Sequence, residues 1–376
     1  MSRLDEAALS LLGQEPVAAY LYDLVALREH CARVRAALPA GVEMFYAIKA
    51  NAEVPNLRTM QPYLDGFEVA SGGELDHLRA HFPNVPILFG GPGKTPAELR
   101  RAAEHQIHVE SLWELRQLAE LHRPVRLLLR MNPALDHRED SPMLMAGKPS
   151  PFGITPDHLP QAVEILRQHP NLEFLGFHLH TRSLQLDLEE HLRLLQRYME
   201  LAEHWSQDFR LHLQVLNVGG GIGVNYRQPS QQFDWEQLCR RLPGRPYTLR
   251  FECGRFLTAF CGTYACEVLD LKESHGQYFA ICRGGTHHFR LPAAQGHSHP
   301  FRVLAGPRRG PVLEKVLLNV VGQLCTPKDR LASAAPVQQV GVGDLLLFPL
   351  AGAYAWNISH HDFLMHPHPR QIFVDA

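Results

Sequence analysis

The chain has 376 residues, of which 45% are hydrophobic, and its formal net charge at pH 7 is -2. A chain of this length and composition can bury a large core, and we expect two domains. It contains no Lys/Arg-rich block, so nothing favours nucleic acid or an anionic membrane as a partner. Seven scattered cysteines without a Cys-x-x-Cys pair argue against a disulfide framework or a zinc ribbon.

The N-terminal segment carries the acidic residues Asp5 and Glu6 and lacks the apolar core of a signal peptide. No later stretch approaches the roughly 20 apolar residues that a membrane helix needs. The expected compartment is therefore the cytoplasm.

Up to about residue 255, short apolar runs alternate with amphipathic stretches of helical period, which is the pattern of strand-helix units. Eight such runs lie at 43–47, 66–70, 86–89, 107–109, 125–131, 172–180, 211–218 and 246–252. Helices are expected between them, at 73–80, 95–103, 112–121, 157–168 and 186–204. The repeats predict an α/β fold, a (β/α)8 TIM barrel with its active site at the carboxyl ends of the strands. A doubly wound open sheet is the structural alternative.

Beyond residue 258 the helical period fades, and β-rich segments follow at 263–269, 278–281, 311–321 and 344–349. The extended apolar segment 17–22 has the composition of a strand that joins these segments and not the barrel. We therefore expect a barrel over residues 24–257 and a β-rich domain built from residues 1–23 and 258–376.

Polar residues gather at the predicted carboxyl ends of the barrel strands, where a barrel enzyme places its chemistry. The first strand ends at Lys49, one of only six lysines among the 37 basic residues. An amine desolvated there can condense with an aldehyde, although a lysine that reaches out to solvent is the plain alternative. The other strand ends supply Glu68 and Ser71, Arg130 and Asn132, His178 and His180, and Glu252.

Three glycines, Gly219, Gly220 and Gly221, follow the seventh predicted strand. Glycines leave backbone N–H groups open to a phosphate because no Cβ blocks the approach, although glycine clusters also form ordinary tight turns. An amine, a phosphate cradle, a carboxylate and a flat histidine ring together are the parts that pyridoxal phosphate requires. Lys49 would hold the aldehyde carbon, and Glu252 would keep the ring nitrogen protonated.

Several ordered motifs support this cofactor. They are Tyr-Ala-Ile-Lys-Ala-Asn at 46–51, Gly-Phe-Glu-Val-Ala-Ser-Gly-Gly-Glu-Leu at 66–75, Arg-Met-Asn-Pro at 130–133, Gly-Phe-His-Leu-His at 176–180, Asn-Val-Gly-Gly-Gly at 217–221, Glu-Cys-Gly-Arg at 252–255, Gly-Gln-Leu-Cys at 322–325 with Asp329, and Gly-Ala-Tyr at 352–354. Over essentially its whole length the chain resembles the fold-type III pyridoxal-phosphate decarboxylases, the group of diaminopimelate and ornithine decarboxylases.

The resemblance implies an alanine racemase-like barrel, pyridoxal 5'-phosphate as the cofactor and a homodimer with shared active sites. Cys325 would reach into the partner subunit's site and protonate the carbanion left by CO2, although the bare sequence marks it only as a buried thiol. The catalytic residues implied are Lys49, Cys325, Glu252 and His178. The cofactor contacts implied are Lys49, His178, Gly219, Gly220, Gly221, Glu252, Gly254, Arg255 and Tyr354.

The stretch 284–294 departs from the diaminopimelate enzymes, which usually carry Arg-Pro-x-x-Tyr there to hold the distal end of the substrate. Arg290 remains, but the tyrosine is absent, and the stretch contains Ala294 and the pair His287 and His288. This variant resembles decarboxylases of siderophore biosynthesis, which act on an amino-acid group joined to a larger carboxylate-rich scaffold. We predict such a citrate-containing substrate, bound by Arg255, Arg290, His287, His288 and Asp329, with Arg182 and Arg283 as further basic residues.

Other functions fit the sequence less well. Diaminopimelate decarboxylase is the alternative, and an amino-acid racemase is a further one that Cys325 and Glu252 disfavour. The histidine pairs at 297/299, 360/361 and 366/368 suggest a metal, yet they lie in Pro/Gly-rich loops without an acidic third ligand at helical spacing. We therefore expect no metal site.

Overall fold

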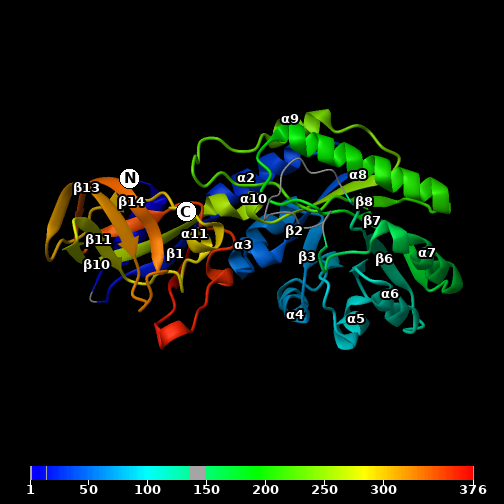
Figure 1. Cartoon of the computed structure of the whole chain (residues 1–376), viewed down its shortest axis with the longest axis horizontal. Helices are drawn as coiled ribbons and strands as arrows, with labels where there is room; N and C mark the ends of the chain where they lie inside the picture. The colour runs from blue at the N-terminus through cyan, green and yellow to red at the C-terminus, as the bar shows by residue number, and fades with distance from the viewer. Residues whose placement is uncertain (1, 14, 135–148, 376) are drawn as a thin grey trace.

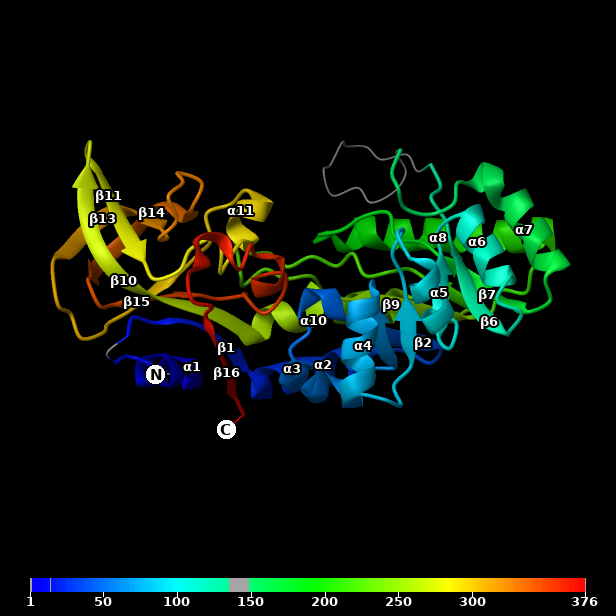
Figure 2. The ribbon, with the colours of Figure 1, turned by 90° about the horizontal axis from the view of Figure 1, so that it is seen from below.

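The computed structural model describes residues 2–13, 15–134 and 149–375 of the chain. Eight parallel strands close into a barrel in chain order, and a second, mostly antiparallel sheet lies beside it. Figures 1 and 2 show the two parts as separate halves, with the barrel and its helices on the right and the second sheet on the left. The predicted (β/α)8 barrel is therefore confirmed, and the open doubly wound sheet is excluded.

The barrel is closed by pairing of its last strand with its first, which sets Phe45 opposite Glu252. Its strands are β2 (Val42–Ala47), β3 (Gly66–Val69), β4 (Ile87–Phe89), β5 (Gln106–Val109), β6 (Val125–Arg130), β7 (Leu172–His178), β8 (Val215–Asn217) and β9 (Thr248–Cys253). The helices around it are α2 (Leu24–Ala37), α3 (Val54–Met60), α4 (Gly72–His81), α5 (Pro96–Ala102), α6 (Leu112–Ala119), α7 (Leu159–Gln168), α8 (Leu188–Phe209), α9 (Trp235–Arg241) and α10 (Arg255–Thr258). Within the described ranges, no helix is long and apolar enough to cross a membrane.

Local capping explains where the barrel helices begin. The Ser71 hydroxyl accepts from the backbone N–H of Glu74 at the start of α4, and Ser111 caps α6 in the same way. Thr95 and Glu98 form a reciprocal capping box at the start of α5. These caps satisfy backbone N–H groups that the helix leaves free, so the loops before α4, α5 and α6 each end at a defined residue.

The second sheet contains both ends of the chain. Its strands are β1 (Ala18–Asp23), β10 (Gly262–Ser274), β11 (Gln277–Cys282), β12 (Arg302–Leu304), β13 (Val312–Val321), β14 (Arg330–Gly341), β15 (Leu345–Phe348) and β16 (Arg370–Val374), with α1 (Arg3–Ser10) and α11 (Leu291–Gln295) beside them. β1 pairs antiparallel with β10 and parallel with β16. The segment 17–22 thus joins this sheet, as predicted.

Three strands of this sheet, β12, β14 and β16, escaped the sequence-based prediction. β14 is rich in alanine and glutamine and contains Pro336, so its residues have little intrinsic preference for a strand. It is a strand because it pairs antiparallel with β13 along most of its length. Pairing with a distant segment therefore outweighs its local composition.

The loop after β15 crosses from the second sheet to the mouth of the barrel. The Asn51 side-chain amide donates to the carbonyl of Gly352 at 2.9 Å, and the Tyr354 N–H donates to the carbonyl of Ala50 at 2.8 Å. These bonds fix the loop against the turn that carries Lys49.

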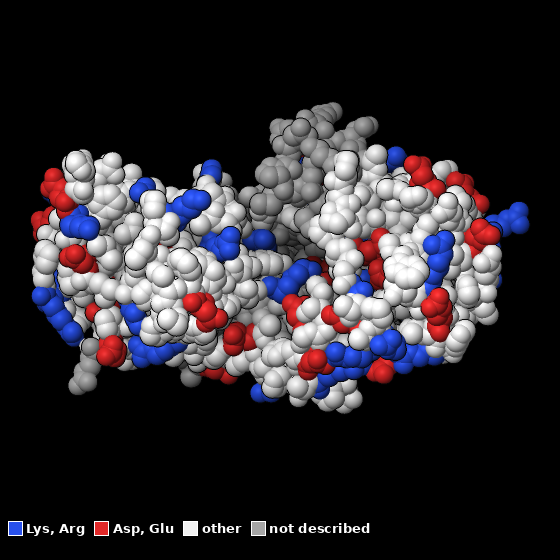
Figure 3. All heavy atoms as spheres, turned by 60° about the horizontal axis from the view of Figure 1, so that its bottom comes forward, with Lys and Arg blue, Asp and Glu red and all other residues white. Residues whose placement is uncertain are grey.

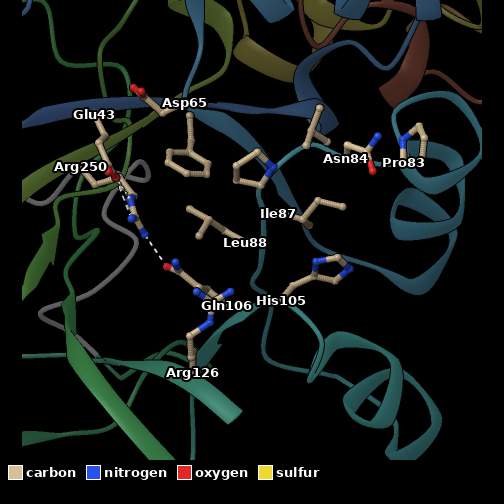
Figure 4. A pocket seen from close by; sticks show the side chains of 13 residues that line it. Glu43, Asp65, Pro83, Asn84, Ile87, Leu88, His105, Gln106, Arg126 and Arg250 are labelled. Carbon is tan, nitrogen blue, oxygen red and sulfur yellow. Dashed lines mark hydrogen bonds and ion pairs between the residues drawn. The ribbon is translucent and has the colours of Figure 1, made fainter. Parts of the chain in front are cut away.

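A cavity of about 570 Å³ opens at the other end of the barrel, beside the amino ends of β3, β4 and β5 (Figure 4). Arg250 lies in its wall and donates to Glu43 at 2.7 Å and to Gln106 at 2.7 Å, as the dashed lines show. Its buried charge is therefore already compensated. Barrel enzymes carry their chemistry at the opposite, carboxyl ends of the strands, so this cavity is not the candidate site.

Substituting Gly176 with Ala should destabilise the fold. Gly176 has φ 155°, and a Cβ there would lie 1.8 Å from the carbonyl oxygen of Val215 on the adjacent strand. Backbone atoms of a closed barrel cannot move away, so we expect a loss of roughly 3 kcal/mol in the free energy of unfolding, measured by urea denaturation. Gly244→Ala is the control, because a Cβ there meets nothing within 4 Å. Equal stability of the two variants would contradict this account of the β7–β8 contact.

Candidate active site

Lys49 lies in the short helix η1 (Ile48–Ala50), directly after β2. Its Nζ is 2.8 Å from the Oε2 atom of Glu68, which is almost fully buried on β3. The lysine side chain is 45% exposed at the barrel mouth, yet the protein around it disfavours its charge. The Glu68 carboxylate outweighs that desolvation and raises the pKa of Lys49. The amine is therefore held at the mouth by a carboxylate.

The surface is hollowed between the two halves of the molecule, with charged side chains around the hollow (Figure 3).

Glu252 is the centre of a second polar group at the end of β9. Its Oε1 atom accepts from the side-chain amide of Asn217 at 2.7 Å. Two histidine nitrogens lie near the same carboxylate, His108 Nε2 at 3.4 Å and His178 Nε2 at 3.7 Å. Burial, together with the charge of Glu68, raises the pKa of Glu252 to about 7, while Lys49 and Asn217 oppose the shift.

His108 and His178 are buried, His180 is half-buried, and their surroundings disfavour the charged form of all three rings. The ring centroids of His108 and His178 are 4.3 Å apart, and the His180 ring lies 6.5 Å from His178 and nearly parallel to it. Desolvation lowers the pKa of His108 and His178 well below the ordinary value and lowers that of His180 to about 3. Among the residues that the structure describes, none forms a hydrogen bond with either ring nitrogen of His178. It therefore presents a flat, neutral ring.

The glycine run after β8 is packed so closely that side chains do not fit. Gly219 and Gly221 have φ of 67° and 81°, and a Cβ on Gly219 would lie 2.5 Å from His180 Nδ1. A Cβ on Gly220 would lie 2.3 Å from the carbonyl oxygen of Glu252. The run therefore needs glycine for both its conformation and its close packing beside the mouth.

Arg255 and Tyr354 border the mouth where α10 begins. The Arg255 guanidinium lies 4.5 Å from the centre of the Tyr354 ring and donates to the Tyr226 hydroxyl at 3.0 Å. A Cβ on Gly254 would lie 3.1 Å from the Tyr354 hydroxyl oxygen. Burial raises the pKa of Tyr354, while the charges of Lys49 and Arg255 oppose the rise. The Tyr354 hydroxyl and the Arg255 guanidinium are thus two groups at the mouth that can bind an anion.

These groups fit pyridoxal phosphate on structural grounds. The donor set combines an amine, a buried carboxylate for a ring nitrogen, a flat buried histidine, and a glycine run with no room for a Cβ on Gly219 or Gly220. Seven residues that were predicted as cofactor contacts lie close together at the barrel mouth. They are Lys49, His178, Gly219, Gly220, Glu252, Gly254 and Tyr354.

The residues predicted for the substrate's distal end lie in the second half of the molecule, and two of them are engaged there. Both oxygens of Asp329 accept backbone N–H groups, from Thr286 at 2.6 Å and Leu324 at 2.8 Å. His288 is fully buried, and its Nε2 lies 3.0 Å from the carbonyl of Pro367. The structure gives both residues a packing role, and their substrate contact stays a prediction.

The other two predicted distal residues and the predicted proton donor differ in exposure. His287 is fully buried, and within the described part of the chain neither of its ring nitrogens has a hydrogen-bond partner. Arg290 is exposed. Cys325 is also exposed, in the turn between β13 and β14, whereas the other six cysteines are buried. The alternative of a buried thiol is therefore wrong for Cys325.

Three residues of the site were not predicted to belong to it, although one of them, Asn217, begins the motif at 217–221. His108 lies inside the short apolar strand β5, Asn217 is the last residue of β8, and Asn357 donates to the backbone carbonyl of Lys49. Only Asn217 carried a usable signal, because it stands two residues before the glycine run at a strand's carboxyl end.

Comparisons with known proteins agree with this geometry. Residues 24–259 match the family model described as "Pyridoxal-dependent decarboxylase, pyridoxal binding domain". A Staphylococcus aureus protein, 2-[(L-alanin-3-ylcarbamoyl)methyl]-2-hydroxybutanedioate decarboxylase, is 42% identical over 96% of this chain and 94% of its own length. Diaminopimelate decarboxylase of Bacteroides thetaiotaomicron is 30% identical over 89% of this chain and 90% of its own.

The fold is shared with solved structures. The crystal structure of diaminopimelate decarboxylase from Helicobacter pylori, complexed with L-lysine, superposes with a TM-score of 0.85 at 25% identity over 98% of this chain and 94% of that one. The chain belongs to the pyridoxal-dependent decarboxylase family, and pyridoxal phosphate is its cofactor.

Proposed function

We propose that this decarboxylase removes the α-carboxylate of an amino-acid group that is joined to a citrate-like scaffold, as in siderophore biosynthesis. The observation that carries the proposal is the 42% identity with the Staphylococcus aureus enzyme across nearly the whole of both chains. The name of that relative's substrate describes an alanine unit linked at carbon 3, through an amide, to a hydroxy-dicarboxylate skeleton. The barrel of residues 24–257 and a β domain of residues 1–23 and 258–376 would both contribute to the site.

Each polar group at the mouth would have one task. Lys49 would bind the cofactor, Glu252 would accept the N–H of the pyridine ring, and His178 would lie flat against that ring. The glycine run, Arg255 and Tyr354 would hold the phosphate. Bound in this way, the cofactor supplies an electron sink for the bond that breaks at the substrate's α-carbon.

The grouping of His108, His178 and Glu252 also has the spacing of a metal site. Among the described residues, ligand atoms of these three lie within 4.8 Å of one another. We assign them to the cofactor, because the matched family model is a pyridoxal-binding domain that spans all three. This assignment keeps the expectation that the enzyme needs no metal.

Arg290 is the strongest candidate for a distal carboxylate of the substrate. Of the three arginines singled out from the sequence, Arg182 pairs with Glu190 at 2.9 Å, and Arg283 donates to Gln323 at 3.1 Å. The exposed Arg290 uses its backbone N–H, which donates to the Ser359 hydroxyl. Because Arg290 is exposed, its guanidinium would be able to bind a substrate carboxylate through two parallel hydrogen bonds.

A homodimer with shared sites would bring the thiol of Cys325 to the partner's substrate. Asp329 fixes the turn that carries Cys325, so the thiol is exposed in a defined place. All seven cysteines are free, and an exposed catalytic thiol requires a reducing compartment, which favours the cytoplasm.

Replacing Lys49 with Ala should abolish covalent attachment of the cofactor and its visible absorption, because no amine remains to bind the aldehyde. Borohydride reduction followed by mass spectrometry would detect any attached cofactor. Lys272→Ala is the control, since Lys272 is an exposed lysine on β10. A Lys49→Ala protein that still carries the cofactor covalently would overturn this role.

Substrate choice can be tested by supplying the holoenzyme separately with a citryl-diaminopropionate conjugate and with meso-diaminopimelate, and by following CO2 release. We expect turnover of the conjugate and little of diaminopimelate, because Arg290 is retained while the distal tyrosine is absent. Turnover of diaminopimelate alone would return the enzyme to lysine biosynthesis.

Shared active sites predict complementation between two inactive variants. Lys49→Ala and Cys325→Ala homodimers should each lose activity, the second while keeping its cofactor. After mixing and subunit exchange, half of the dimers would be mixed and each would have one intact site, so up to about 25% of wild-type activity should return. No recovery in mixtures shown by native mass spectrometry to contain heterodimers would place Cys325 and Lys49 in the same subunit's site.

A further inference from the structure

We infer that Asn217 is a positioning residue that joins the phosphate loop to the carboxylate of Glu252 and keeps that carboxylate ionised. The inference rests on the proposed cofactor contacts and gives a role to a residue that the sequence marked only as the first of the motif at 217–221.

The hydrogen bonds of Asn217 fix the orientation of its amide. Its Oδ1 atom accepts the backbone N–H of Gly219 at 2.9 Å, so its other terminal atom is the NH2 group. One hydrogen of that group goes to Glu252 Oε1 at 2.7 Å. Asn217 is fully buried, so neither bond competes with water. A single side chain thus links the glycine run to the carboxylate.

The Asn217 amide nitrogen also lies 3.3 Å from His108 Nε2, and that ring nitrogen is 3.4 Å from Glu252 Oε1. Desolvation lowers the pKa of the buried His108 well below its ordinary value. His108 therefore packs against the amide and the carboxylate without adding a positive charge beside Glu252.

An N–H donor matters here because Glu252 is close to losing its charge. Desolvation raises its pKa to about 7, and a protonated carboxyl would be a poor acceptor for a pyridine N–H. Among the described residues, the charged or titratable groups that face it are Lys49 after β2, Glu68 on β3, His108 on β5, His178 on β7 and Arg250 on β9. Asn217 on β8 donates to the ionised form and so favours it.

Two substitutions of Asn217 should have opposite dependence on pH when the dissociation constant of pyridoxal phosphate is measured by fluorescence. Asn217→Ala removes the donor, which raises the pKa of Glu252. We expect affinity to fall about 10- to 100-fold near pH 7 and the deficit to shrink as pH rises and Glu252 ionises again.

Asn217→Asp keeps an acceptor for Gly219 and gives the site a carboxyl that can share one proton with Glu252. Its affinity should be close to wild type at low pH and should fall as pH rises and that proton is lost. This conservative variant also keeps the test open if Asn217→Ala does not fold.

A double-mutant cycle with Glu252→Gln separates positioning of Glu252 from support of the loop. If Asn217 acts through the charge of Glu252, the loss caused by Asn217→Ala should be at least about fivefold smaller in the Glu252→Gln background. Asn171→Ala is the matched control, because the Asn171 amide donates to the carbonyls of Ala119 and Arg123 just before β7, at the other end of the barrel.

Losses that multiply independently in the cycle, or losses in both Asn217 variants that do not change with pH, would overturn the inference. Wild-type binding of the cofactor through Lys49 would still stand in that case. Failure of the wild-type protein to bind the cofactor would instead refute the proposed function.

Discussion

Pairing of β9 with β2 closes the barrel, and the site depends on that closure. Lys49 follows β2 and Glu252 is the residue before the last of β9, so the two residues are neighbours only because the first and last strands share hydrogen bonds. All eight strands run parallel, and therefore the polar residue at the end of each strand arrives at one mouth. The amine, the two carboxylates and the glycine run come from four different strands for this reason.

Gathering these charges in a closed barrel has an electrostatic cost, which a network of buried bonds offsets. Lys94, almost fully buried, pairs with Glu114 at 2.7 Å and also donates to the backbone carbonyl of His108 at 2.8 Å. Arg130, the last residue of β6, pairs at 2.7 Å with Glu110, which directly follows the neighbouring strand β5. These pairs hold β5 in place behind the mouth. They also add positive charge near His108, which supports its neutral state.

The second half of the molecule supplies the mouth with parts that the barrel lacks. Its loop after β15 carries Tyr354 to the start of α10, and Asn357 bonds the backbone of Lys49. Its β13–β14 turn, fixed by Asp329, presents the only exposed cysteine of the chain. One half therefore carries the amine, the two carboxylates and the glycine run, while the other adds Tyr354 and the thiol that we propose acts in the partner.

The sequence by itself determined the barrel and most of its polar strand ends, because hydrophobic period and strand-end residues are local properties. Lys49, Glu252 and the glycine run were identifiable on that basis. Only the tertiary structure decided that Asn217 and His108 lie beside Glu252. It also decided that the Asp329 carboxylate accepts two backbone N–H groups, and that β14 is a strand. These features depend on which distant segments pack together, and no local pattern records that choice.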